Sequence, residues 1–297
     1  MRSTNFYYHL LAIVIVIFWG TTFVSTKMLI LAGLTPAVIF TIRFIIAYLL
    51  ILTISHKQLW SKSFKDELAM IGLGVTGGSL YFLTENMALE YTTATNTSLI
   101  VCSCPLFASI LCAWFAHEHQ GKKQWFGTIL AFMGMAVVVL NGRFVLNLNP
   151  VGDMLAFVAC ICWAVYSLII KKVGHKYSSL FITRKVFAYG VLTILFYFIF
   201  HSEEIPSSID IFFDPVVWGN LAFLSIVASF ACYLLWTVCI HRLGTIEATN
   251  YVYLNPMATI VAASIVLGEV ITIWFILGSA LILLGLWVSN KRGKNEG

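Results

Sequence analysis

The chain has 297 residues, of which 60% are hydrophobic and only 10% are charged. In soluble domains about a quarter of all residues are charged, so these values exclude an ordinary soluble domain. The same composition excludes an intrinsically disordered chain. Seven cysteines spread over this length also exclude a disulfide-rich secreted scaffold. A membrane helix takes about 20 apolar residues, so the chain has material for about ten such helices.

Ten continuous apolar runs follow one another along the chain, bounded by charged residues, glycine or proline. Continuous rather than alternating apolar character favours membrane helices over lipid-facing β-strands. The predicted helices are, roughly, 10–29, 37–55, 68–89, 93–116 and 125–140, and, after a polar stretch at 141–150, residues 153–170, 180–200, 216–240, 247–267 and 271–289. We therefore predict an all-α integral membrane protein with ten transmembrane helices in contact with a lipid bilayer.

Lysine and arginine residues fall in every second connection between the predicted helices, and the other connections contain only Arg143. The longest of these other connections carries carboxylates instead, Glu203, Glu204, Asp210 and Asp214. Because basic residues remain on the cytoplasmic side of a membrane, both termini are predicted to be cytoplasmic. We interpret the net charge of +5 as this topology signal, Arg184 and Lys185 included, and expect no nucleic-acid partner.

All seven cysteines lie inside predicted helices. The pairs Cys102/Cys104 and Cys160/Cys162 are two residues apart, which points their side chains to opposite sides of a helix. Apolar packing is the better interpretation, and neither a metal site nor a cofactor is predicted.

The chain contains no HExxH motif and no phosphate-binding loop, so we do not predict an enzyme or an ATP-driven pump. An integral-membrane enzyme of another type and a non-transporting scaffold remain as alternatives.

The chain also contains an internal repeat. A shift of 151 positions superimposes four landmark residues, and a shift of 144 superimposes two more. The matched pairs are Pro105/Pro256, Glu118/Glu269, Gly127/Gly278, Gly134/Gly285, Trp19/Trp163 and Lys27/Lys171. We predict two five-helix repeats, 1–142 and 150–292. Because five is odd, the second repeat is inverted in the membrane relative to the first, an arrangement typical of secondary transporters.

Several short motifs carry a resemblance to a known family. In the first repeat they are Phe18-Trp19-Gly20-Thr21-Thr22-Phe23, Thr41-Ile42-Arg43-Phe44 and Ala88-Leu89-Glu90-Tyr91, followed by Pro105 and Glu118. The second repeat shows the pattern more loosely, as Ile240-His241-Arg242-Leu243-Gly244, Asn255-Pro256 and Gly268-Glu269. On these motifs the whole chain resembles the EamA-like branch of the drug/metabolite transporter superfamily.

The resemblance implies a ten-helix carrier of the bacterial inner (plasma) membrane. Such a carrier takes small polar metabolites, and is often an exporter of amino acids or related compounds. Two residues depart from the family pattern. His117 stands where the family usually has glycine before the glutamate, and Glu85 is an unusual carboxylate within a span.

Ionisable side chains inside predicted spans are costly in lipid and are therefore candidates for function. Arg43 and Glu85 are predicted at similar depth, in the outer third of the second and third helices. Arg43 could hold a substrate carboxylate, and Glu85 could hold an amino group or exchange a coupling proton. A static ion pair between the two helices is the alternative interpretation.

Pro105 and Pro256 fall within predicted helices at matching repeat positions, where each removes a backbone hydrogen bond. They indicate a central cavity, although ordinary kinks and core packing are the alternative. The further candidates for its lining are Trp19, Tyr81, Asn96, Trp163, Tyr166, Trp236, Asn250 and Asn255. Glu118 and Glu269 end the fourth and ninth helices, and we interpret them as end caps or gate contacts.

Glycine spacing predicts close contacts between helices. Gly127/Gly134 and Gly278/Gly285 keep two glycines on one face of the fifth and tenth helices, for contact within one molecule or between two. A run of glycines at 72, 74, 77 and 78 predicts that the third helix packs closely or bends.

These features predict a secondary transporter of small polar metabolites that works by alternating access. Proton exchange at Glu85 and the outward gradient of the metabolite are the two energy sources left open. The predicted partners are a small-molecule substrate and the lipid bilayer. The sequence is compatible with a monomer or a homodimer.

Overall fold

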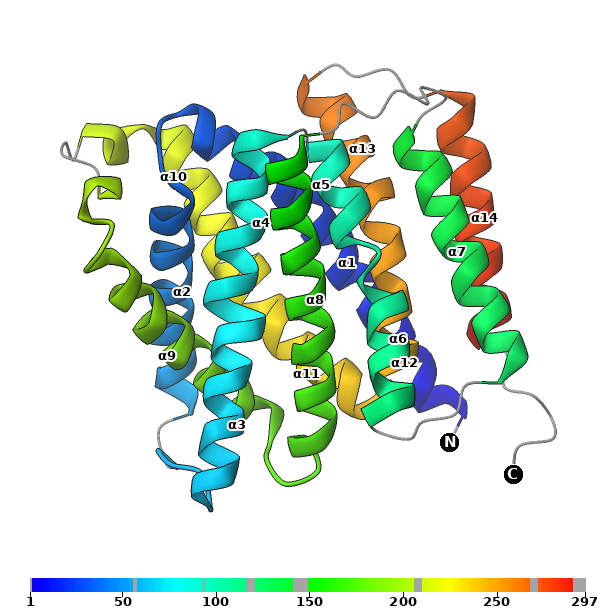
Figure 1. The fold of residues 1–297 in the computed structure, drawn as a ribbon, viewed down its shortest axis with the longest axis horizontal. Helices are drawn as coiled ribbons and strands as arrows, with labels where there is room; N and C mark the ends of the chain where they lie inside the picture. The colour runs from blue at the N-terminus through cyan, green and yellow to red at the C-terminus, as the bar shows by residue number, and fades with distance from the viewer. Residues whose placement is uncertain are drawn as a thin grey trace.

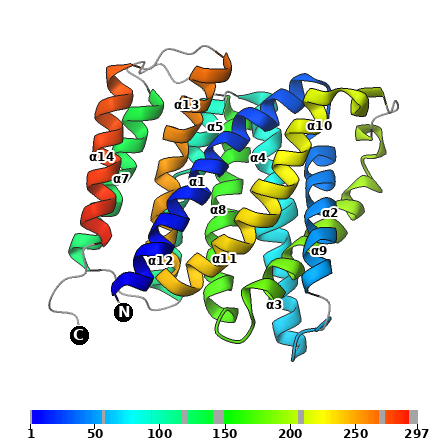
Figure 2. The same cartoon turned by 180° about the vertical axis from the view of Figure 1, so that it is seen from behind.

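The computed structural model describes residues 2–55, 58–92, 94–115, 121–140, 149–205, 210–267 and 272–290. These residues form helices and connections without a strand among them, which confirms the all-α class (Figures 1 and 2). The α-helices are α1 (Arg2–Leu31), α2 (Pro36–Ile54), α3 (Phe64–Gly74), α4 (Leu80–Tyr91), α5 (Ala94–Val101), α6 (Cys104–Phe115), α7 (Lys122–Leu140), α8 (Pro150–Val173), α9 (Ser179–Phe198), α10 (Pro215–Ala222), α11 (Cys232–Leu243), α12 (Thr245–Asn250), α13 (Asn255–Leu267) and α14 (Ile273–Asn290).

Shorter segments of other helical types lie between these helices. The segments η1 (Val75–Ser79) and η4 (Phe223–Ala231) are π-helical. The 3₁₀ segments are η2 (Ser202–Glu204), η3 (Asp210–Phe213) and η5 (Tyr251–Leu254).

The helices run between two ends of the molecule (Figure 1). At the lower end, α1, α3 and α9 begin and α8, α11 and α14 end; α2 and α8 begin at the upper end. Pro36 and Pro150 occupy the first turns of α2 and α8, where a missing backbone N–H leaves no helical bond unmade. Gly33 and Gly244 turn the chain after α1 and α11 with φ angles of 100° and 96°, a region that favours glycine.

Among the described residues, six helical segments are long and apolar enough to cross a membrane, and each coincides with one of the ten predicted helices. They are Phe6–Leu31, Pro36–Ile54, Phe64–Tyr91, Pro150–Val173, Ser179–Phe198 and Pro215–Leu243. Two of the other four predicted helices are broken in the middle. A turn at residues 102–103 separates α5 from α6, and η5 separates α12 from α13.

Large apolar side chains cover much of the outside of the bundle. Leu192 and Phe196 of α9 and Leu283 and Leu284 of α14 are all exposed by half or more. A water-soluble protein rarely exposes so much apolar surface, so this surface suits contact with lipid chains.

Both π-helical segments lie inside long helical rods, η1 between α3 and α4 and η4 between α10 and α11. Gly78 in η1 has non-helical backbone angles, so the predicted glycine run coincides with a kink. Close packing also requires glycine here. A Cβ atom on Gly77 would lie 2.1 Å from the ring of Tyr166, and one on Gly74 would lie 2.4 Å from Cβ of Tyr189.

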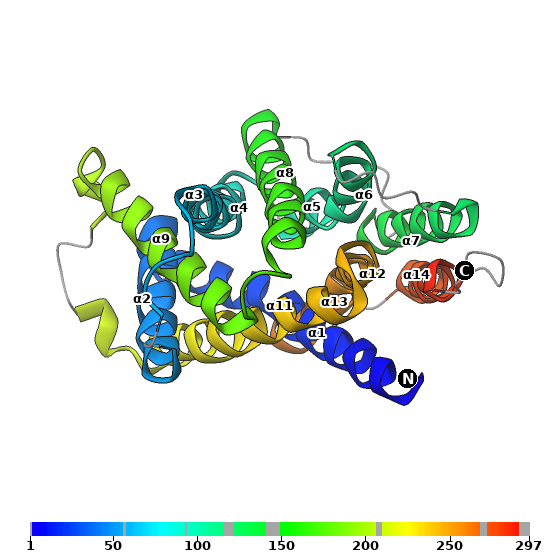
Figure 3. The same cartoon turned by 90° about the horizontal axis from the view of Figure 1, so that it is seen from below.

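The predicted glycine contact lies between α7 and α14 of the same chain. A Cβ atom on Gly127 would lie 2.6 Å from the carbonyl oxygen of Gly285, and one on Gly134 would lie 2.7 Å from that of Gly278. The two backbones therefore touch directly, which only residues without a side chain permit. We call this contact the glycine seam; Figure 3 shows it at the edge of the bundle, far from α2 and α9.

Candidate functional site

A narrow pocket lies among the central helices, and we call it the upper pocket. Its cavity volume is about 30 Å³, room for one or two water molecules. Residues from α1, α2, α4, α5, α6, α8, α11, η5 and α13 meet around it, so both halves of the chain contribute. The lining residues are Trp19, Thr22, Phe23, Arg43, Tyr81, Phe82, Glu85, Val101, Cys104, Trp163, Tyr233, Val252 and Asn255.

Arg43 brings a cation to this pocket from α2. Its side chain is only 2% exposed, and its Nε donates a hydrogen bond to Ser229 Oγ at 2.9 Å. The guanidinium carbon lies 4.4 Å from the centre of the Phe82 ring, in cation–π contact. Ser229 belongs to η4, so the π-helical segment positions the partner of this buried charge.

Glu85 brings a carboxyl group to the same pocket from α4. It is 8% exposed, and its Oε1 accepts a hydrogen bond of 2.8 Å from the hydroxyl of Tyr81, one helical turn earlier. The ion pairs found in the described part of the chain join other residues, so Arg43 and Glu85 do not form the static pair considered above. They share one pocket while each is held by its own neighbour.

Aromatic rings form the wall between these two groups and the rest of the core. The Trp19 and Trp163 rings meet edge to face with centroids 5.4 Å apart, and Tyr81 lies 5.1 Å from Trp163. Trp19 Nε1 donates to the carbonyl oxygen of Ala228 in η4 at 3.0 Å. Tyr233 donates in the same way to a carbonyl in η1, that of Gly77. Each π-helical segment thus offers a carbonyl to a ring of the pocket wall.

Two polar atoms of the lining remain without a hydrogen-bond partner among the described residues. They are Nε1 of Trp163 and Oδ1 of Asn255. Buried polar atoms are normally paired, so a donor and an acceptor left in one pocket wall are suited to a polar ligand.

Six of the ten residues predicted to bind substrate line the upper pocket: Trp19, Arg43, Tyr81, Glu85, Trp163 and Asn255. Tyr166 and Trp236 are fully buried behind the wall, 5.1 Å and 6.4 Å from the Trp163 ring. Asn250 points elsewhere, because its Nδ2 donates to Ser289 Oγ of α14 at 2.8 Å. The Asn96 side chain lies outside the described residues.

The residues predicted to break or gate helices fall into two groups. Pro105 and Pro256 lie in the first turns of α6 and α13, directly after the breaks in their rods. Proline is well tolerated there because the first N–H groups of a helix have no partner in any case. Glu118 and Glu269 lie outside the described residues.

The sequence interpretation missed two important lining residues, Tyr233 and Phe82. Tyr233 lies three positions before Trp236, which places both on one face of α11. Phe82 directly follows Tyr81 and was treated as one more apolar residue of a span. Helical spacing from the residues already selected could have found Tyr233, but nothing in the sequence singles out Phe82.

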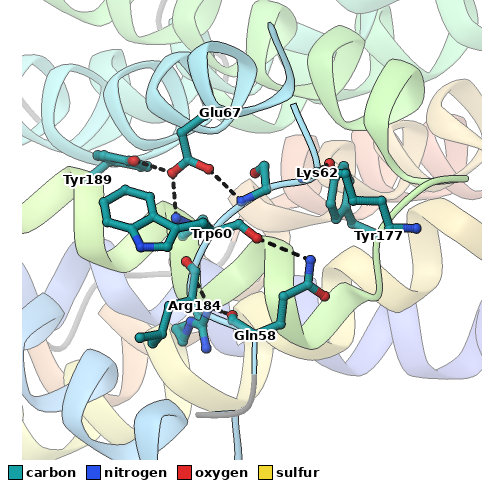
Figure 4. A network of polar contacts seen from close by, with 10 residues as sticks. Gln58, Trp60, Lys62, Glu67, Tyr177, Arg184 and Tyr189 are labelled. Carbon is teal, nitrogen blue, oxygen red and sulfur yellow. Dashed lines mark hydrogen bonds and ion pairs between the residues drawn. The ribbon is translucent and has the colours of Figure 1, made fainter. Parts of the chain in front are cut away.

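A second group of polar residues lies at the lower end, between the α2–α3 connection and α9 (Figure 4). Glu67 is at its centre. Its carboxylate accepts hydrogen bonds from Lys185 and Tyr189 and, at 2.8 Å, from the backbone N–H of Ser61. We call this group the lower clamp, because it joins the first half of the chain to the second.

Asp66 and Arg184 extend the lower clamp. Asp66 pairs with Lys176 at 2.9 Å and accepts a hydrogen bond of 2.9 Å from the Tyr177 hydroxyl. Burial, together with the bond to Asp66, raises the pKa of the Tyr177 phenol, which therefore stays protonated at neutral pH. Arg184 donates to the carbonyl oxygens of Ser55 and Gln58.

Arg184 and Lys185 therefore do more than mark topology. Both residues are buried, 3% and 5% exposed, and both hold partners from the α2–α3 connection or α3. The sequence showed their charge but not the acceptors, which lie about 120 positions away in the chain.

Comparisons with known proteins agree with this architecture. The EamA-like transporter family matches residues 6–140 and again 150–291. The chain belongs to the EamA-like transporter family. Its members are membrane transporters, and the chain is accordingly a multi-pass membrane protein of this kind.

The relatives extend over most of the chain. A protein of Archaeoglobus fulgidus described as an uncharacterized transporter is 27% identical over 92% of this chain and 95% of its own length. A probable terminal-alkyne amino-acid exporter of Streptantibioticus cattleyicolor is 26% identical over 76% of this chain and 74% of its own length. One crystal structure aligns with 98% of this chain and with 97% of its own chain, at 17% sequence identity and a TM-score of 0.74. This similarity shows a shared fold alone.

Proposed function

We propose that this EamA-family protein is a secondary transporter that exports amino acids or related small polar metabolites by alternating access. The observation that carries the proposal is the upper pocket, where buried Arg43 and Glu85 face one cavity without pairing with each other. An α-amino acid carries a carboxylate and an ammonium group. Arg43 would donate to the carboxylate, and Glu85 would accept from the ammonium group.

The substrate class is also consistent with one relative. The Streptantibioticus cattleyicolor relative is described as a probable terminal-alkyne amino-acid exporter. The Trp163 indole N–H and the side-chain amide oxygen of Asn255 (Oδ1), both without described partners, would make additional hydrogen bonds to a polar substrate.

The proposed transport unit has ten membrane helices in two inverted repeats, 1–142 and 150–292. The two π-helical segments support it, because η1 and η4 interrupt the third helical rod of each half. The two broken rods support it as well, because α5–α6 and α12–α13 are the fourth rod of each half and restart with Pro105 and Pro256. Discontinuous helices at the site are typical of inverted-repeat transporters.

Movement of the rods is part of the proposal. The upper pocket has room for one or two water molecules, less than an amino acid needs, so binding requires its walls to separate. The kink at Gly78 and the breaks before α6 and α13 are the proposed pivots. The lower end, where α1 begins and α14 ends, would face the cytoplasm in the bacterial inner membrane.

Transport by purified protein in liposomes tests this function. Vesicles loaded with labelled amino acids should show efflux and counterflow with the wild type, with and without a pH gradient. Arg43→Lys should reduce transport at least tenfold, because a point charge cannot reproduce a bidentate contact. Lys172→Gln removes an exposed cation at the end of α8, outside the upper pocket, and is the control that should transport normally.

Glu85 is tested separately as the proton-exchanging group. Glu85→Gln should abolish the response to a pH gradient while keeping the shape of the site. If the variant retains both the rate and the pH response, proton exchange at Glu85 is wrong. Absence of transport for every amino acid, or chemical conversion of a solute or lipid by the wild type, would favour a scaffold or an enzyme instead.

A further inference from the structure

A second and larger cavity opens at the lower end, and we call it the lower pocket. Its volume is about 450 Å³, within the range of small-molecule sites. It lies where α8 and α11 end and α12 begins, close together in the view from below (Figure 3). Its lining shares no residue with that of the upper pocket. On α8, Ile170 of the lower pocket is seven residues after Trp163, about 10 Å along the helix axis.

The lower pocket is basic. Lys171, His175, His241 and Arg242 line it, and its described lining contains no carboxylate. Arg242 is held beside the pocket by Tyr8, whose ring centre is 5.6 Å from the guanidinium carbon. Cations gathered around a concave surface raise the local concentration of anions.

A buried hydroxyl group points to a ligand rather than to a merely solvated basic surface. Thr245 is 3% exposed and lines the pocket, yet its Oγ1 has no hydrogen-bond partner in the described part of the chain. Gly244 places it there by turning the chain between α11 and α12 with φ of 96°. Most buried hydroxyls are paired, and a ligand oxygen would supply the missing partner.

His241 offers a second such atom. Its Nδ1 lies 3.1 Å from Ser179 Oγ, which fixes the ring, and its Nε2 has no partner among the described residues. The ring can reach this position because residue 174 is glycine. A Cβ atom there would lie 2.2 Å from His241 Nε2.

We propose that the lower pocket binds the phosphate group of an anionic ligand, held by Arg242, His241 and Thr245. A guanidinium, an imidazole and a hydroxyl from two elements can donate to different oxygens of one tetrahedral group. The phosphate group belongs either to a soluble metabolite or to a phospholipid headgroup. The site is distinct from the upper pocket, and it does not depend on the identity of the transported substrate.

Binding of inorganic phosphate to the full-length protein in dodecyl maltoside micelles, which contain no phosphate group, tests the site by calorimetry. We expect saturable binding to the wild type and at least tenfold weaker binding to Arg242→Gln and to Thr245→Val. Lys172→Gln removes a neighbouring exposed cation outside the lining and should bind as the wild type does. Because the readout is binding, the result is independent of whether amino acids are transported.

A second arm identifies the source of the phosphate group. Phosphatidylglycerol added to the micelles should block phosphate binding if the native ligand is a headgroup, and should leave it unchanged if the ligand is soluble. Either result supports the site. Absence of phosphate binding in the lipid-free micelles, or equal binding by the wild type and Arg242→Gln, overturns the proposal. Thr245→Val is nearly isosteric, so its effect separates loss of a donor from loss of fold.

Discussion

Removal of the charge on Glu67 is expected to be among the most destabilising single changes at the lower end. Glu67→Gln keeps the size of the side chain but removes the charge that Lys185, Tyr189 and the backbone of Ser61 all contact. The Lys185 side chain is 7% exposed and that of Glu67 is 14% exposed, so the lysine would be left buried without its counter-ion.

The expected cost follows from this burial. Breaking a buried ion pair by removing one partner costs about 3–5 kcal/mol, and the remaining exposure of Glu67 favours the lower limit, about 3 kcal/mol. Replacing both partners, as Glu67→Gln with Lys185→Gln, removes the unpaired charge. The double variant should therefore lose much less stability than the sum of the two single variants.

Unfolding in mixed detergent micelles, followed by tryptophan fluorescence, measures these differences. The neighbouring pair of Asp66 and Lys176 is a matched control, because the Lys176 side chain is 48% exposed. Lys176→Gln should lose only a small fraction of the stability that Glu67→Gln loses, because the exposed lysine is screened by water and Asp66 keeps the hydrogen bond from Tyr177. Equal losses in the two variants, or strict additivity in the double variant, would refute a buried, charge-dependent clamp.

Three further changes test the packing of the rods. Gly134→Ala should destabilise the protein by about 1–3 kcal/mol, because the new Cβ would meet the backbone of α14. The control is Gly219→Ala, where the new Cβ has open space, and it should leave stability unchanged in the same unfolding assay. Gly77→Ala should slow transport by crowding the Tyr166 ring, and Tyr166→Ala in the same chain should restore part of the rate; full activity of the single variant would exclude η1 as a pivot. Tyr233→Phe should cost about 1–3 kcal/mol by leaving the carbonyl of η1 unpaired, and an unchanged unfolding midpoint would contradict that bond.

The sequence alone was sufficient to predict the features that depend on composition and on residue spacing. Continuous apolar runs predicted the helices, and paired glycines predicted the seam between α7 and α14. It was also sufficient to select Arg43 and Glu85, because charges within an apolar run are conspicuous. It did not show the polar partner of Arg43, since Ser229 lies 186 positions away in the chain.

The remaining features depend on tertiary contacts or on backbone detail. Asn250 looked like a cavity residue by its position near a proline, but the close approach of α14 provides it with Ser289. The π-helical segments have no sequence signature of their own beyond the glycines of η1. The sequence did not predict the lower clamp, because carboxylates and lysines near helix ends ordinarily face water. Glu67 and Lys185 are largely buried only because α9 packs against α3.

The glycine seam has a consequence for how the molecule can move. The contact is isologous, because Gly127 meets Gly285 as Gly134 meets Gly278, so the last helix of one half pairs with the last helix of the other through matching surfaces. Where the glycines meet, the two backbones touch without a side chain between them, so we expect α7 and α14 to move together as one rigid unit. If one half of the chain rotates against the other, α7 and α14 would therefore move least. The largest helix displacements would occur on the opposite side of the bundle, around α2 and α9.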